Sequence, residues 1–267
     1  MNAFPLLLRA EWIKVRSLRS TYLMIALAVL VGLGVGLLYL TSTADAWATT
    51  LTARDRAAFD PVADAFSGFQ FAELVLAALG VLIATSEYTT GTISATLTAA
   101  PRRLRVFAAK LAVLTTVALP ICLACSFAAV LLGQQALHAV PDTAVHVGLG
   151  NAHVLRGIIG AGLYMTAVTL VGFGIGALLR HTPAALTLMF SLVFLAWPAA
   201  RALEGFSYLP DRWLLVNAAD ALVATHATTG PNVPRTPSYA MAWVEIMIYV
   251  LVFVGLGAWR SSRDVPG

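Results

Sequence analysis

TYLMIALAVLVGLGVGLLYL, Thr21–Leu40, contains no charged side chain in twenty consecutive positions. An α-helix of about 20 apolar residues is long enough to cross the roughly 30 Å hydrocarbon core of a bilayer. The run exceeds the 7–15 apolar residues that are usual in a secretory signal, so we expect it to be retained as a span. The whole chain of 267 residues is 59% hydrophobic and 11% charged, against about 25% charged in soluble domains. The composition indicates a membrane protein.

Five further apolar runs approach or reach the same length. The six runs are Thr21–Leu40, Phe69–Thr85, Leu111–Leu132, Gly157–Leu179, Ala184–Ala200 and Ala240–Ala258. A spanning segment must satisfy its own backbone hydrogen bonds, and these runs lack the alternation of barrel strands, so we expect helices. The sequence therefore predicts an all-α, polytopic membrane protein, with residues 1–267 forming a single domain of six transmembrane helices.

Basic residues are distributed unevenly between the two sides of this predicted bundle. Of the 17 Lys and Arg residues, eleven fall on the side that holds both termini and six on the other side. The positive-inside rule then places both termini in the cytoplasm, in a multi-pass protein of the cell membrane. The connection Thr41–Gly68 becomes an acidic outer loop.

Residues 1–20 are predicted to form an interfacial helix before the first span. At 100° per residue, Leu6, Ala10 and Ile13 fall on one side and most of the basic residues fall opposite, although Lys14 lies within the apolar half. Two interpretations remain open. The basic residues only fix the topology, or the helix also supports a protein docked on the cytoplasmic face.

A polar and basic segment, SEYTTGTISATLTAAPRRLR at Ser86–Arg105, separates the second and third runs. We interpret it as the core of a cytoplasmic loop over residues 87–110 that contains a short helix ending before Pro101. A helix of about three turns is marginal in isolation. It therefore needs a partner, unless the arginines serve only to fix topology.

This segment resembles a pattern that follows the second span in membrane subunits of type-2 ABC exporters. The matching residues are Glu87, Gly91, Thr92, Pro101 and Lys110, and the opening RAEWIKVRSLRSTY looks like actinobacterial members of that family. The sequence departs from many relatives in having TTG where they carry a basic residue before the glycine.

The resemblance implies that the loop forms a coupling helix seated in a cleft of a separate ATPase subunit. The implied coupling residues are Glu87, Gly91, Thr92, Ile93, Leu97, Pro101, Arg102 and Arg103. It also implies an assembly of two permease copies, identical or different, with two ATPase subunits, and an outer loop at residues 203–239 that re-enters the membrane as a gate.

The chain carries no phosphate-binding loop of the Walker A type, which requires a lysine directly after its last glycine. Its two lysines, Lys14 and Lys110, follow isoleucine and alanine. We therefore expect no cofactor in this chain, with ATP and Mg²⁺ bound by the partner, and a transport subunit that is not itself an enzyme. Lipid and protein partners are expected, and no nucleic acid.

Two acidic residues within the predicted spans favour a different hypothesis. Glu73 and Glu245 lie about one turn inside the second and sixth runs. Ionisable residues at membrane depth are functional candidates, so both are assigned to the possible substrate path. The alternative function is a secondary transporter coupled to protons through Glu73 or Glu245. A membrane enzyme or structural protein is a third class, for which no catalytic set is found.

Three other patterns in the sequence do not predict a catalytic or metal site. His138, His146 and His153 have spacings that match no zinc signature. Cys122 and Cys125 form a C-x-x-C with apolar flanks, which indicates small buried residues rather than a redox pair. Glycines in the first and fourth runs each include G-x-x-x-G, which suits packing either within the bundle or between subunits. The transported cargo cannot be derived from any of them.

Overall fold

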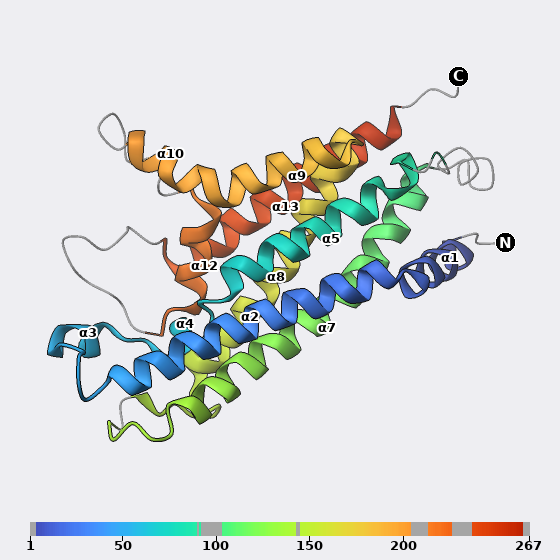
Figure 1. Cartoon of the computed structure of the whole chain (residues 1–267). Coiled ribbons are helices and arrows are strands. Elements are labelled where there is room, and N and C mark those ends of the chain that lie inside the picture. The colour runs from blue at the N-terminus through green and yellow to red at the C-terminus, as the bar shows by residue number, and fades with distance from the viewer. Residues whose placement is uncertain are drawn as a thin grey trace.

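The computed structural model describes residues 4–89, 91, 103–142, 145–203, 213–225 and 237–263, and within these ranges every extended regular element is a helix. The α-helices are α1 (Phe4–Ser17), α2 (Arg19–Ala46), α3 (Ala53–Ala58), α4 (Pro61–Ala65), α5 (Phe69–Thr89), α7 (Arg103–Ala136), α8 (Ala152–Leu179), α9 (Thr182–Phe190), α10 (Ala196–Leu203), α12 (Leu215–Val223) and α13 (Tyr239–Ser262). Figure 1 shows the long helices running side by side as a bundle. The predicted all-α class is confirmed.

Five helices are long and apolar enough to cross a membrane, namely α2, α5, α7, α8 and α13. They contain five of the six predicted runs. The other run, Ala184–Ala200, is divided into α9, a π-helical segment η2 (Ser191–Leu195) and α10. Pro198 has no N–H to donate to the carbonyl four residues earlier, and the Ala196 N–H donates instead to Ser191 O, five residues back. This run therefore contains a π-bulge one turn before its proline.

Helix α8 occupies the centre of the bundle and packs against α5, α7, α9, α12 and α13. Its glycines allow this close approach. A Cβ atom on Gly172 would lie 2.3 Å from the backbone oxygen of Ala77 in α5, and one on Gly174 would lie 2.5 Å from the carbonyl carbon of Phe253 in α13. The glycines of the fourth run thus pack within the chain, which settles one of the alternatives left open by the sequence.

In helix α2, the glycines on only one side of the helix allow a close approach to a neighbouring segment. A Cβ on Gly36 would lie 2.6 Å from the backbone oxygen of Ala65, whereas Gly34 has no neighbouring atom within 4 Å. Helices α2 and α13 are the least buried of the five long helices. Large apolar side chains such as Leu30 and Leu251 are exposed on them, as expected of surfaces that face lipid or another subunit.

The bundle has two ends that differ in structure (Figure 1). The α1 end carries α1, the last turn of α5, the start of α7, the turn between α8 and α9, and the last turn of α13. The α12 end carries α3, α4 and α12 with the first turns of α5, α8 and α13. Helix α8 ends at the α1 end, and α13 begins at the α12 end. The chain must therefore cross the length of the bundle between them, and α9, η2 and α10 form part of this crossing.

Candidate functional site

Helix α1 directs a charged residue, Glu11, toward the bundle. Glu11 is only 4% exposed and lies on the side of α1 that faces α7, whereas Leu6 and Ile13 of the apolar stripe point away and are exposed. Phe4, Leu7, Glu11 and Val15 share the inward side at helical spacing. The sequence analysis missed Glu11. An acid at helical spacing from the apolar residues Phe4, Leu7 and Val15 was a signal that could have identified it.

Glu11 belongs to an ion-pair cluster of four residues, Glu11, Lys14, Glu87 and Lys110, that joins α1, α5 and α7. Lys14 Nζ lies 2.7 Å from Glu11 Oε1 and 2.6 Å from Glu87 Oε1. Lys110 Nζ lies 2.8 Å from Glu87 Oε1 and 3.2 Å from Glu11 Oε2. Each acid thus contacts both lysines of the chain. This explains why Lys14 falls outside the basic face of α1.

The cluster balances two positive with two negative charges in a largely buried place. The Lys110 side chain is 10% exposed and that of Lys14 is 43% exposed. Burial lowers the pKa of Lys14, but the hydrogen bonds and charges of Glu11 and Glu87 outweigh it, so the pKa is raised from its usual value. Buried charges of this kind are tolerated only when they are paired. Glu87 Oε2 is buried and has no hydrogen-bond partner in the described part of the chain.

Both ends of the segment between α5 and α7 are fixed by this cluster, through Glu87 before it and Lys110 after it. Helix α5 ends at Thr89, and Gly91 follows with φ +70° while its N–H donates to Tyr88 O at 3.4 Å. A glycine in the left-handed region is a common helix stop.

The helix bounds narrow the predicted loop of residues 87–110. Glu87 lies in the last turn of α5, and α7 begins at Arg103, so Arg103 is helical and not part of a loop. Thr92, Ile93, Leu97, Pro101 and Arg102 lie outside the described residues, and so does most of the predicted outer loop at residues 203–239. Their roles remain predictions.

The structure does not bring Glu73 and Glu245 into one cavity. Glu73 is 2% exposed on α5 and accepts a hydrogen bond from the Tyr164 hydroxyl of α8 at 2.5 Å. It also contributes to the lining of a cavity of about 750 Å³ at the α12 end. Glu245 is buried on α13 and does not line that cavity.

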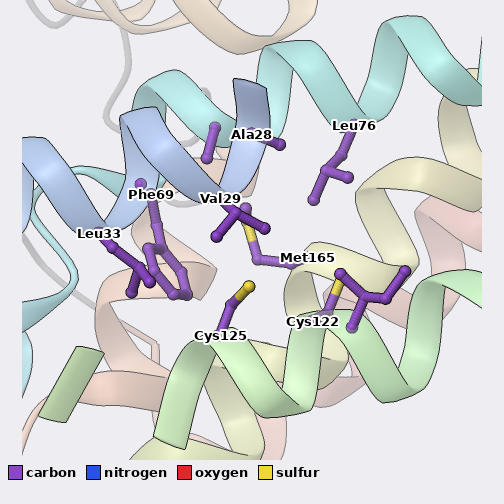
Figure 2. Close-up of a pocket in the computed structure, with 11 residues that line it drawn as sticks. Ala28, Val29, Leu33, Phe69, Leu76, Cys122, Cys125 and Met165 are labelled. Carbon is purple, nitrogen blue, oxygen red and sulfur yellow. The ribbon is translucent and has the colours of Figure 1, made fainter. Parts of the chain in front are cut away.

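Cys122 and Cys125 are free thiols on α7. Figure 2 shows both side chains beside Met165, facing Val29 and Leu33 of α2. The pocket that they line has a volume of about 20 Å³ and is apolar; a space of that kind is a small packing gap. No group of three His, Cys, Asp or Glu in the described part of the chain could hold a metal ion.

The comparison with known protein families gives a match that covers most of the chain. Residues 7–196 match the ABC-2 family transporter proteins, a range that includes Glu11, Lys14, Glu87 and Lys110. The chain belongs to this family. No curated protein matches the chain.

Membership of the ABC-2 family confirms the resemblance that the segment around Glu87 indicates. It identifies the chain as a component of membrane transport and not itself a catalytic enzyme. The ABC-2 family gives no support to a proton-coupled transporter that uses Glu73 or Glu245. An actinobacterial origin remains a prediction.

Proposed function

We propose that this ABC-2 family protein is the permease subunit of an ATP-driven exporter in the cell membrane. In this proposal it forms the substrate pathway and is driven by a separate ATPase chain that docks at the α1 end. The ion-pair cluster is the observation that carries the proposal, because it links α1 to the last turn of α5 and the first turns of α7.

The cluster is suited to transmit a displacement. A pull on the segment 90–102 acts on α5 through Glu87 and on α7 through Lys110, and both residues are tied to α1 through Glu11 and Lys14. Paired charges with short, charge-assisted contacts resist separation better than neutral contacts do. The three helices should therefore move together.

The proposed orientation places the α1 end in the cytoplasm and the α12 end outside. Eleven of the 17 basic residues belong to the connections assigned to the α1 end, as the positive-inside rule requires. We further propose that α9, η2 and α10 together form the sixth span, since they are helical from Thr182 to Leu203. Twenty residues suffice for one crossing.

The proposed assembly contains two permease copies and two ATPase subunits. The absence of a Walker A loop assigns ATP and Mg²⁺ to the ATPase chains. The exposed apolar faces of α2 and α13 leave room for a second copy as well as for lipid.

The test is co-expression with a candidate ABC ATPase from the same organism, followed by co-purification and an export assay. Glu87→Ala removes the acid that holds both lysines, and Gly91→Pro changes the turn after α5. We expect both variants to insert normally but to lose most of the co-purified ATPase and of the export. Asp45→Ala, an exposed acid at the α12 end, is the matched control and should behave like the parent. Equal export and co-purification in all four proteins would refute the coupling role.

A further inference from the structure

The cavity at the α12 end is not explained by the proposed coupling mechanism. It has a volume of about 750 Å³ and is enclosed by residues of α3, α4, α5, α8, α12 and α13. A volume between about 300 and 1,000 Å³ is usual for sites that hold small organic molecules. The cavity therefore has the size of a ligand site, and the groups in its wall indicate which ligand chemistry fits.

Four carboxyl groups line this cavity, and one of them, that of Asp60, already holds the local structure together. Asp60 caps α4 by accepting from the N–H groups of Val62 and Ala63 at 3.0 and 3.1 Å. Its second oxygen accepts from the Thr225 N–H at 2.6 Å, which ties α4 to the end of α12. Asp60 thus has no oxygen left for a ligand.

The other three carboxyl groups retain free acceptor positions. Glu73 uses Oε2 for Tyr164, and in the described part of the chain its Oε1 has no partner although the residue is 2% exposed. Asp64 uses only Oδ2, which accepts from the Asp60 N–H at 3.1 Å. Asp220 also lines the cavity, and its carboxyl group makes no hydrogen bond to any described residue, although its backbone oxygen accepts from the Ala224 N–H.

Among the described residues, no basic side chain forms an ion pair with these three carboxyl groups. Arg156 also lines the cavity, but its guanidinium lies 4.5 Å from the centre of the Tyr239 ring and donates to Ala224 O at 3.3 Å. It forms no ion pair with a carboxyl group of the described chain. Uncompensated acids in a partly enclosed site attract a cation.

The wall of the cavity favours an organic cation over a metal ion. The carboxyl groups are not grouped as a metal site in the described ranges. The lining also includes Phe66, Phe69, Tyr164 and Tyr239, whose ring faces can attract a cation and whose apolar area suits a hydrophobic body.

We propose that this cavity is a binding site for lipophilic organic cations, held by Asp64, Glu73 and Asp220 against the aromatic wall. The assignment of this site to cargo rests on the proposed exporter function, in which it holds cargo at the outer end before release. Binding itself requires no ATPase. It can therefore be measured on the purified chain.

Tritiated tetraphenylphosphonium, a lipophilic cation without a titratable group, is the probe for a scintillation proximity assay on the full chain in detergent. We expect saturable binding that unlabelled tetraphenylphosphonium displaces. Triphenylphosphine oxide carries similar aryl groups without a net charge, so it should not compete at the same concentration. Absence of saturable binding, or equal competition by the neutral compound, would overturn the proposal.

Variants test whether binding occurs in this cavity. Asp220→Asn and Asp64→Asn should each weaken binding about fivefold, which corresponds to the ~1 kcal/mol of a hydrated ion pair. Asp45→Asn makes the same charge change outside the cavity and should leave the affinity unchanged. If the Asp64 and Asp220 variants elute as monodisperse protein and bind like the parent, the site is elsewhere. Loss of ATPase co-purification with intact cation binding would instead refute the coupling proposal alone.

Discussion

At the scale of single residues, the ion-pair cluster depends most on Lys110, because it is its most buried cation. Lys110→Met leaves Glu11 and Glu87 with only the half-exposed Lys14. We expect a loss of about 1–3 kcal/mol in the free energy of unfolding. The measurement is the midpoint of thermal unfolding in detergent. Arg105→Met, at an exposed position of the same helix, should change the midpoint little, and equal effects of the two variants would contradict the role of the cluster.

A double variant separates the pairing from the burial of Lys110. Glu87→Gln alone leaves Lys110 with only the longer 3.2 Å contact to Glu11. If the two residues are directly coupled, Glu87→Gln combined with Lys110→Met should cost less than the sum of the single changes, by about 0.5–3 kcal/mol. Strict additivity would show that the contact contributes nothing to stability.

Sequence reasoning identified three of the four residues in this cluster and misjudged how they are arranged. Glu87 and Lys110 followed from the resemblance to ABC-2 exporters, and Lys14 was noted as an exception to the basic face of α1. Their common contact could not be predicted, because it depends on how α1 lies against α7. Glu11 was missed because the predicted apolar stripe of Leu6 and Ile13 does not include it. The structure leaves that stripe exposed.

At the scale of helices, the close packing of α5 on α8 depends on positions without a side chain. Gly172→Ala would place a methyl group 2.3 Å from the backbone oxygen of Ala77, which cannot yield as a flexible side chain can. We expect overpacking to cost about 1–3 kcal/mol. Gly34→Ala adds the same atom where nothing lies within 4 Å, so the midpoint of thermal unfolding should fall only for Gly172→Ala. A fall of the same size for Gly34→Ala would contradict this explanation.

The apolar runs predicted which segments form long helices but not where these helices end. Helix α7 begins at Arg103, eight residues before the predicted run at Leu111, because a helix continues into polar residues as long as its backbone bonds are made. The run Ala184–Ala200 was expected to be one continuous helix, and its π-bulge depends on the backbone geometry near Pro198. Hydropathy contains neither kind of information.

At the scale of the whole molecule, the two ends should face opposite sides of the membrane. In a background with Cys122→Ala and Cys125→Ala, Ser17→Cys at the α1 end should react with an impermeant thiol reagent only from the cytosol. Ala57→Cys on α3 should react only from outside. Both positions are exposed, so access depends on the side of the membrane alone. The opposite pattern would overturn the orientation and the coupling proposal with it.

The cavity at the α12 end is a property of the whole molecule that the sequence could not reveal. Asp64, Glu73, Tyr164 and Asp220 come from four helices, of which α4 and α5 are consecutive whereas α8 and α12 lie far along the chain. Glu73 was predicted as part of a substrate path, because an acid within an apolar run is conspicuous. Asp64 and Asp220 lie in short helices outside the predicted apolar runs, where an acid is not conspicuous by its depth in the membrane. Only the packing of α4 and α12 over the bundle brings them to one space.

The same packing gives cation binding an expected dependence on pH. Burial raises the pKa of Asp64 to about 6, with a further contribution from the charge of Asp60. The side chain of Asp220 is open to the cavity, but the surrounding protein partly desolvates its carboxyl group and raises its pKa to about 6. Both groups are charged above this pH and attract a cation, whereas below it they are protonated and must release a proton before they can pair. The affinity for tetraphenylphosphonium should therefore fall as the pH decreases through about 6.

Other charged or titratable groups also line the cavity, and the test must separate them from these two. They are Asp60, Glu73, His153, Arg156, Tyr164 and Tyr239. Protonation of His153 would repel a cation and so change the affinity in the same direction. A double variant, Asp64→Asn with Asp220→Asn, keeps His153 but lacks both aspartates, so its affinity should be lower than that of the parent and almost independent of pH between about 5 and 7.5. His153→Ala should keep the slope of the parent. If the double variant keeps the slope and His153→Ala loses it, the histidine controls binding and the role assigned to the two aspartates is wrong.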